Sequence, residues 1–127
     1  MKSALVHALW VGAGGFVGAI LRYAVQLVLH RQLHVFPFGT LAVNLIGCAL
    51  IGWIVGLAET RQLIGPELRS FAVMGLLGGF TTYSTFGYET FTLMRDGAYL
   101  VASASVAAHV VLGLAAVALG YAIAAPR

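Results

Sequence analysis

Charged residues are scarce in this chain, since Asp, Glu, Lys and Arg together make up 9% of its 127 residues. Only four residues are acidic, and cysteine occurs once, at Cys48. A single cysteine excludes a disulfide framework within one chain. The sequence also lacks a nucleophile beside a base and any close group of metal-binding side chains, which argues against an enzyme. We expect Cys48 to be a small packing residue.

Most residues of the chain are apolar. They account for 61% of the chain, and the mean hydropathy is +0.96. About 20 apolar residues cross the roughly 30 Å of hydrocarbon in a bilayer. Four apolar runs are long enough, and they predict an all-α membrane protein with a single four-span domain over residues 1–127. The predicted spans are residues 4–29, 38–58, 68–94 and 98–124.

The stretches between the predicted spans are too short for a soluble catalytic domain, so the function is expected inside the bilayer. The first run is too long for the apolar core of a cleaved signal and lacks a convincing cleavage site, so it is interpreted as a span. Glycines recur four residues apart, at Gly14 and Gly18 and at Gly52 and Gly56. Such spacing lets helices pack closely. Since four short helices enclose little interior, self-association is also expected.

Basic residues are nearly balanced between the two ends of the predicted spans. One end collects four of them and the other three, because Arg22 lies near the end of the first span. The topology of a membrane protein follows an excess of Lys and Arg on one side, and here the excess is small. We therefore infer that the chain inserts in both orientations and pairs as an antiparallel homodimer. The first end carries Lys2, Arg61, Arg69 and Arg127, and the second carries Arg22, Arg31 and Arg95.

The third predicted span is interrupted by glycines, hydroxyls and aromatic rings over residues 78–86. An unpaired backbone group in hydrocarbon costs several kcal/mol, so a broken membrane helix persists only where protein, water or an ion completes its hydrogen bonds. Broken helices of this kind bind ions in transporters. This segment is therefore the predicted working site.

Polar side chains inside a span are costly and mark functional sites. Asn44 lies about a third of the way into the second span, where its amide could donate to an anion or tie two helices together. Arg22 could be an interfacial anchor or a cation at the mouth of an anion path. Glu89 is expected to accept hydrogen bonds from neighbouring hydroxyls.

The fourth span carries a second group of polar positions. Ser105, His109 and Gly113 are spaced by four residues and share one face. The stripe could line a wet pathway, or its hydroxyl could bond to the preceding turn while the histidine is satisfied in the core. Both interpretations remain open from the sequence.

The interrupted segment offers donors suited to a small, hard anion. Ser84 and Thr85 supply hydroxyls, and the start of the resumed helix carries unpaired amides. Tyr83 and Phe86 lie three residues apart, so their rings should be close, and ring edges attract anions weakly. The carbonyls freed over residues 78–81 suit a cation instead. The segment is therefore expected to combine a structural cation with a mobile anion.

These residues together resemble the Fluc (CrcB) family of microbial fluoride channels, over essentially the whole chain. Each motif alone is weak, but their order and spacing in a four-span chain are specific. The motifs are the run from Gly14 to Tyr23, Gly39 and Thr40 with Val43 and Asn44, Gly78 and Gly79 with the run from Thr81 to Phe86, and the polar stripe of the fourth span.

The resemblance implies a fluoride-selective passive channel of the inner membrane, with two pores in an antiparallel dimer and a sodium ion at the dimer axis. Gly78 and Thr81 of each subunit would hold the sodium through their carbonyls. Asn44 would donate to fluoride, and the rings of Tyr83 and Phe86 would form a box beside it. Further pore positions on this basis are Ser84, Thr85, Ser105 and His109, with Arg22 toward a vestibule.

Two positions depart from the family pattern. The first position of the aromatic box is usually phenylalanine, and here it is Tyr83. In the fourth span, Ser105 and His109 occupy a track of hydroxyls, and Gly113 adds no side chain at its next step.

The main alternative is a small multidrug-type antiporter, which is also a short, dual-topology, four-helix chain. That class exchanges a cationic compound for protons and requires a glutamate in the first span, where this chain has only Arg22 as a charge. A second alternative, a packing subunit that transports nothing, leaves the interruption of the third span unexplained.

Overall fold

The computed structural model describes residues 2–30, 36–61 and 64–125, and every regular element within these ranges is a helix. This confirms the predicted all-α class. The elements are α1 (Lys2–His30), α2 (Phe38–Arg61), α3 (Pro66–Arg69), the π-helix η1 (Ser70–Leu77), α4 (Gly78–Phe80), α5 (Tyr83–Arg95) and α6 (Tyr99–Ala124).

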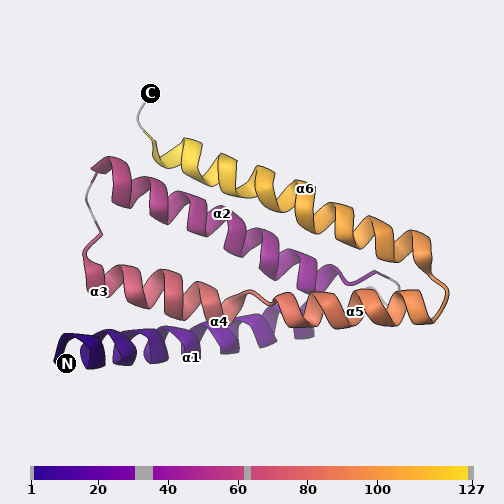
Figure 1. The fold of residues 1–127 in the computed structure, drawn as a ribbon, viewed down its shortest axis with the longest axis horizontal. Helices are drawn as coiled ribbons and strands as arrows, with labels where there is room; N and C mark the ends of the chain where they lie inside the picture. The colour runs from indigo at the N-terminus through magenta and orange to yellow at the C-terminus, as the bar shows by residue number, and fades with distance from the viewer. Residues whose placement is uncertain (1, 31–35, 62–63, 126–127) are drawn as a thin grey trace.

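The helices lie side by side in one bundle, with α2 between α6 and the row that runs from α3 to α5 (Figure 1). The closest partners are α2 with α6, and α1 with η1 and α4. The beginning of α1 and the end of α6 lie at the same end of the bundle (Figure 1).

Three of the described helices are long and apolar enough to cross a membrane: residues 3–29, 38–61 and 99–124. They match three of the predicted spans within a few residues. Helix α2 extends to Arg61, past the predicted limit at residue 58, because the helical backbone continues after the apolar run ends. The region predicted as the third span, residues 68–94, is divided among α3, η1, α4 and α5.

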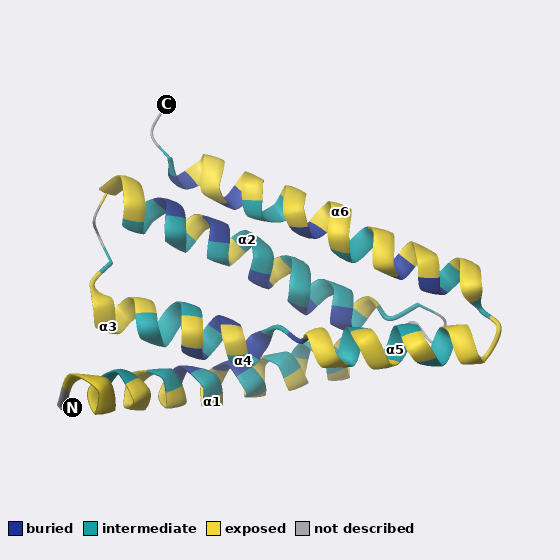
Figure 2. Ribbon diagram, viewed as in Figure 1, coloured by how far each residue is buried: buried dark blue, intermediate teal, exposed yellow. Residues whose placement is uncertain are grey.

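Exposed residues cover much of the outward faces of the helices (Figure 2), and many of them are large and apolar. Leu9, Phe16 and Leu100 are 66%, 70% and 85% exposed. Helices that are apolar on all sides belong in lipid or in the core of a large protein. With so few buried side chains in a chain of this size, the exposed apolar faces and the long helices indicate a membrane protein.

Glycines allow the helix backbones to touch. A methyl group added at Gly14 or Gly18 of α1 would collide with the backbone of η1. One added at Gly52 or Gly56 of α2 would collide with α6. The predicted role of these pairs in close helix packing is therefore confirmed within one chain, and self-association remains a prediction.

A tight turn reverses the chain between α5 and α6. Gly97 has a φ of 79°, a left-handed conformation that favours glycine. Its amide donates to Met94, and the amide of Ala98 donates to Leu93, so two carbonyls at the end of α5 are satisfied. The turn lets α6 return along α5, which places His109 of α6 beside Phe86 of α5.

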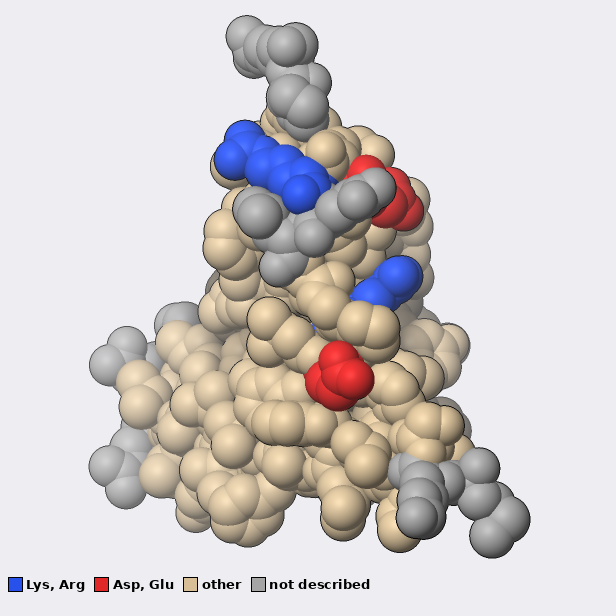
Figure 3. Space-filling view, turned by 90° about the vertical axis from the view of Figure 1, so that its left-hand side faces the viewer, with Lys and Arg blue, Asp and Glu red and all other residues tan. Residues whose placement is uncertain are grey.

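Charged groups are few at the end of the bundle where α1 begins and α6 ends, and they are scattered over an otherwise uncharged surface (Figure 3). The expected balance of basic residues included Arg31 and Arg127, and both lie outside the described residues. The dual topology inferred from that balance remains a prediction.

Candidate functional site

The helical row is interrupted at two residues. Helix α4 ends at Phe80 and α5 begins at Tyr83. Between them the backbone is extended, with φ and ψ of −82° and 160° at Thr81 and of −151° and 114° at Thr82. The interruption is shorter than the polar run of residues 78–86. Residues 78–80 of that run belong to α4, and its residues from Tyr83 onward belong to α5.

Asn44 of α2 holds the extended segment with both ends of its amide. Its Nδ2 donates to the carbonyl of Thr82 at 3.1 Å, and its Oδ1 accepts from the amide of Thr82 at 2.8 Å. The side chain thus pairs with the Thr82 backbone as a neighbouring strand would. In an uninterrupted helix the Thr82 amide would donate to Gly78, so the bond to Asn44 leaves the Gly78 carbonyl without that donor.

Arg22 of α1 reaches the same segment. Its Nη1 donates to the carbonyl of Thr81 at 3.3 Å. The Thr81 side chain turns back and donates to the carbonyl of Leu77, which also accepts the Thr81 amide. Side chains therefore complete several of the hydrogen bonds that the interruption gives up, which is the protein alternative among the three that the sequence analysis allowed: protein, water or an ion.

Thr82 caps the helix that follows the interruption. Its side chain accepts from the amide of Thr85 at 3.2 Å and donates to the Thr85 hydroxyl at 2.9 Å. Thr82 is 6% exposed. The sequence analysis did not single out Thr82, although a threonine just before a resumed helix is a common N-cap. The position of Thr82 directly before the resumed helix is the sequence signal that could have identified it as a cap.

A cavity of about 450 Å³ opens beside the interruption. We call it the central cavity. It brings together six of the predicted site positions, from α2, α4, the extended segment, α5 and α6: Asn44, Gly78, Thr81, Tyr83, Phe86 and His109. Thr82 and Cys48 also line it.

Aromatic rings form one wall of the central cavity. The ring centroids of Tyr83 and Phe86 are 5.7 Å apart, with an angle of 54° between the planes. The rings are therefore neighbours, as their spacing predicts. Phe86 also lies 4.3 Å from the imidazole of His109, a contact that sequence spacing could not reveal because it joins two helices.

The three positions of the predicted stripe on α6 do not share one environment. Ser105 is 0% exposed and Gly113 is also buried, with the Cys48 sulfur beside it. His109 faces the central cavity, and its Nδ1 lies 2.9 Å from the carbonyl of Ser105. Of the three positions, His109 is the one that lines the central cavity.

The remaining predicted positions lie around the interruption. Tyr83 lines the central cavity but is 83% exposed. Ser84 is exposed, and its hydroxyl lies 3.5 Å from that of Thr82. Thr85 lines a different cavity, described next.

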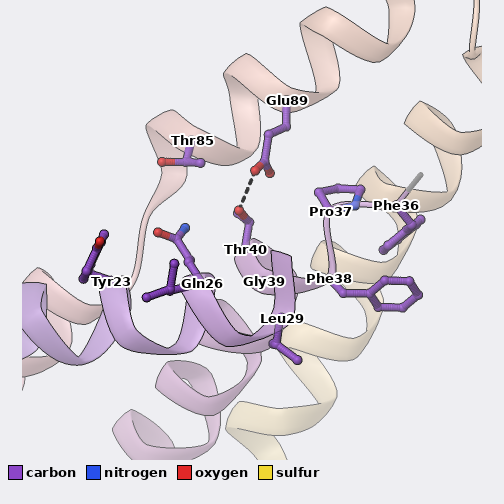
Figure 4. Close-up of a pocket in the computed structure, with 11 residues that line it drawn as sticks. Tyr23, Gln26, Leu29, Phe36, Pro37, Phe38, Gly39, Thr40, Thr85 and Glu89 are labelled. Atoms are coloured by element: carbon purple, nitrogen blue, oxygen red, sulfur yellow. Dashed lines mark hydrogen bonds between the residues drawn. The ribbon is translucent and has the colours of Figure 1, made fainter. Parts of the chain in front are cut away.

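A second cavity of about 340 Å³, the side cavity, lies between α1, α2 and α5 (Figure 4). Thr40 of α2 donates to the Glu89 carboxylate at 2.8 Å, which confirms that Glu89 accepts from a neighbouring hydroxyl. Thr85 lines the side cavity and is hydrogen-bonded to Thr82, which lines the central cavity. A hydrogen bond thus joins a residue that lines one cavity to a residue that lines the other.

Of the two residues whose carbonyls are expected to hold sodium, Gly78 begins α4 and Thr81 lies in the interruption. The Gly78 carbonyl is freed from the Thr82 amide and suits a hard cation such as sodium. The Thr81 carbonyl accepts from Arg22, so a sodium ion there would share this oxygen with a guanidinium. The Thr81 carbonyl is therefore already hydrogen-bonded, whereas the Gly78 carbonyl has lost the Thr82 amide.

The sequence around this interruption matches a known family. Residues 9–121 match the family described as CrcB-like protein, Camphor Resistance (CrcB). The chain belongs to the CrcB-like family. The match covers the interruption, both cavities and every predicted site residue.

Three relatives of this chain are each named a fluoride-specific ion channel, FluC. One from Chlorobium phaeobacteroides strain BS1 is 56% identical over 89 residues, 70% of either chain. One from Chlorobaculum tepidum is 50% identical over 109 residues, 86% of either chain. One from Chlorobium chlorochromatii is 44% identical over 120 residues, 94% of this chain and 93% of the relative. These names describe channels rather than enzymes.

Proposed function

We propose that this chain is a fluoride-selective passive channel of the inner membrane. The observation that carries the proposal is the convergence of Asn44, Thr82, Phe86 and His109 on the central cavity, beside an interruption in the helical row. The names of its relatives support the same ion. A passive pore with an acidic exterior would expel fluoride that entered the cell as the neutral acid.

The residues around the interruption supply what a dehydrated anion needs. Asn44 uses one of the two hydrogens on Nδ2 for Thr82, so its second hydrogen is available as a donor. The rings of Tyr83 and Phe86 present edges with partial positive charge. Weak and multiple contacts of this kind let an ion leave as readily as it enters, which conduction requires.

A route away from the central cavity is offered by the hydroxyls of Thr82 and Thr85. Thr82 lines the central cavity and Thr85 the side cavity, and their hydroxyls are bonded to each other. An anion could pass from one set of donors to the next along this pair. Ser84, whose hydroxyl lies near Thr82, belongs to the same group.

The finer architecture is part of the proposal. Residues 68–94 form one interrupted span, which makes four spans with the three long helices. Two copies pair in antiparallel orientation and provide two pores. A sodium ion at the dimer axis would be held by the carbonyls of Gly78 and Thr81, with Arg22 sharing the latter. When bound, the sodium would supply fixed positive charge at the interruption.

The alternative, a small multidrug-type antiporter, finds no support in the geometry. Helix α1 carries no acidic residue, and its internal charge, Arg22, donates to the backbone at the interruption. That class needs an acid in the first span to bind its cationic substrate, and the described α1 offers none. Antiport of a cationic compound is therefore kept as an alternative outcome of the liposome experiment described next.

Ion efflux from liposomes tests the function directly. Purified protein is reconstituted into vesicles loaded with fluoride or chloride, and release is followed with ion-selective electrodes after a potassium ionophore clamps the voltage. Fluoride efflux without chloride efflux is the expected result. Proton-coupled uptake of a quaternary ammonium compound would support the antiporter, and no transport of either kind would overturn the proposal.

Dual topology has a test of its own. A reporter that is active on only one side of the membrane is fused to the C-terminus, with a matched reporter for the other side. Both reporters should be active in comparable amounts. If every copy reports from the same side, the antiparallel arrangement is wrong, although a channel of another architecture would remain.

A further inference from the structure

Gly47 of α2 lies against the interruption. A methyl group added at Gly47 would overlap the side-chain methyl group, Cγ2, of Thr81. The next nearest atoms are the Cβ of Thr81 at 3.7 Å and the ring of Phe80 at 3.9 Å, both at ordinary contact distances. Gly47, Thr81 and Thr82 all line the central cavity. The obstacle to a side chain at Gly47 is therefore a single methyl group, on a residue beside the proposed ion path.

Two neighbours on α2 contact two consecutive residues of the interruption. Asn44 and Gly47 lie three residues apart, so they share one face of the helix. Asn44 pairs with the backbone amide and carbonyl of Thr82. Gly47, with no side chain, leaves room for the methyl group of Thr81. One position thus binds the interruption, and the other allows it to approach.

The Thr81 methyl group cannot move aside without the loss of a hydrogen bond. The Thr81 hydroxyl donates to the carbonyl of Leu77 at 2.9 Å. A rotation about χ1 would carry the methyl group away from Gly47, but it would also take the hydroxyl off that carbonyl, and β-branched side chains are stiff at χ1. A shift of the backbone would instead draw the Thr81 carbonyl away from Arg22, which donates to it at 3.3 Å. The methyl group is therefore held by the same bonds that shape the interruption.

We propose that Gly47 is a positioning residue for the anion path. The absence of a side chain at Gly47 lets Thr81 lie against α2, and this holds Thr82 within reach of Asn44. Gly47 offers the anion no donor of its own, so its effect passes through Thr81 and Thr82. A displaced interruption would also turn the Asn44 amide, the proposed fluoride donor, away from its present direction. The transport consequence rests on the proposed function, whereas the effect on the position of the interruption does not.

Gly47→Ala tests the contact. Alanine is a better helix former than glycine, so without the contact the variant should be neutral or more stable. With the contact, the added methyl group should shift the segment toward open forms by roughly tenfold. Hydrogen–deuterium exchange of the Thr82 amide, read by mass spectrometry at single residues, should therefore become roughly tenfold faster. Fluoride efflux from liposomes should fall by roughly the same factor or more.

Thr81→Ser supplies the rescue. Serine keeps the hydroxyl that donates to Leu77 and lacks Cγ2, the atom that an added methyl group at Gly47 would overlap. The double variant Gly47→Ala/Thr81→Ser should therefore match Thr81→Ser alone within about threefold, in both Thr82 exchange and fluoride efflux. A packing defect elsewhere in the bundle would not be repaired by removing a methyl group from Thr81. Rescue thus separates a positioning role from a general loss of stability.

The matched control is Gly15→Ala on α1. A methyl group added at Gly15 would lie 3.8 Å from the carbonyl oxygen of Gly75, an ordinary contact, and Gly15 does not line the central cavity. This variant should keep the Thr82 exchange rate and the fluoride efflux of the unchanged protein. A tenfold effect there would mean that any methyl group between these helices disturbs the interruption, which would overturn the special role of Gly47.

The other outcomes are equally decisive. Slow exchange and normal efflux in Gly47→Ala would overturn the inference, and so would a double variant that stays as impaired as Gly47→Ala. If Gly47→Ala fails to elute as a single species, the double variant decides, because a recovered single species supports the contact and a second failure overturns it. If the unchanged protein carries no fluoride, the proposed function fails, while the exchange of the Thr82 amide still tests Gly47.

Discussion

Asn44 gives the most direct test of how the interruption is held. Its side chain makes two hydrogen bonds to the backbone of Thr82, at 2.8 and 3.1 Å, and Thr82 is 6% exposed. In Asn44→Ala, the amide and the carbonyl of Thr82 both lose their partner. A buried backbone group left unpaired costs about 1–3 kcal/mol.

The size of the effect can be worked out for the Thr82 amide alone. A loss of about 2 kcal/mol corresponds to roughly a thirtyfold change in the equilibrium between closed and open forms of the segment. Hydrogen–deuterium exchange, read by mass spectrometry with fragmentation to single residues, measures that equilibrium at Thr82. The exchange rate should rise by roughly thirtyfold in Asn44→Ala, and the fluoride flux should be lost.

Asn44→Asp separates the clamp from the ion ligand. Its carboxylate keeps an acceptor for the Thr82 amide but sets its second oxygen against the Thr82 carbonyl, so exchange at that amide should rise less than in Asn44→Ala. It has no donor and repels an anion, so the flux should still be lost. Ile46→Ala, a change at a lipid-exposed position of the same helix, serves as the control and should leave both measurements unchanged.

Two results would refute this reasoning. If Asn44→Ala exchanges at the rate of the unchanged protein, the amide does not hold the interruption closed. If Asn44→Asp conducts fluoride normally, the side chain is a clamp alone and the anion is bound elsewhere.

Three further changes test other parts of the structure. Gly120→Val should lower the free energy of unfolding by about 1–3 kcal/mol, because any side chain there meets the backbone of Ala49. The control is Gly12→Ala, at an open position, which should leave thermal stability in detergent unchanged. Equal losses of stability in both variants would contradict the packing argument. Thr82→Val should destabilise the start of α5 by about 1 kcal/mol, because the helix loses its cap. Amide exchange should become faster in the first turn of α5 but not in α6. A uniform increase in exchange over both helices would argue against a local cap. Tyr83→Phe should keep the fluoride flux within about twofold, since the side chain is 83% exposed, and a large drop in flux would give the hydroxyl a role in the pore.

The long helices could be predicted from the sequence because apolar runs of this length permit little else. The described spans at residues 3–29, 38–61 and 99–124 differ from the predicted ones by a few residues at their ends. The largest difference is at α2, where the helix continues through polar residues to Arg61. Hydropathy locates the lipid-facing part of a helix, whereas backbone hydrogen bonding decides where the helix stops.

The details of the interruption could not be predicted, because they depend on contacts between distant residues. Sequence spacing correctly placed the rings of Tyr83 and Phe86 together, since both lie on one helix. It could not show that Asn44 pairs with the backbone of Thr82, which lies 38 residues further along. Nor could the sequence show which residues of the polar run 78–86 have an extended backbone. Glycines are accommodated in a helix when tertiary packing supports it, so their presence alone does not mark where the helix breaks. The eight-residue π-helix η1 left no recognisable pattern in the sequence.

The pairing of α2 with α6 has a consequence for biosynthesis. These helices pack closely through Gly52 and Gly120, yet the whole row from α3 to α5 is translated between them. A nascent chain must therefore hold α2 in the bilayer with its glycine surface unpaired until the row from α3 to α5, and then α6, have been synthesised. Truncation shortly before α6 would leave the Gly52 face of α2 without its partner, exposing a surface that is shaped for a helix rather than for lipid.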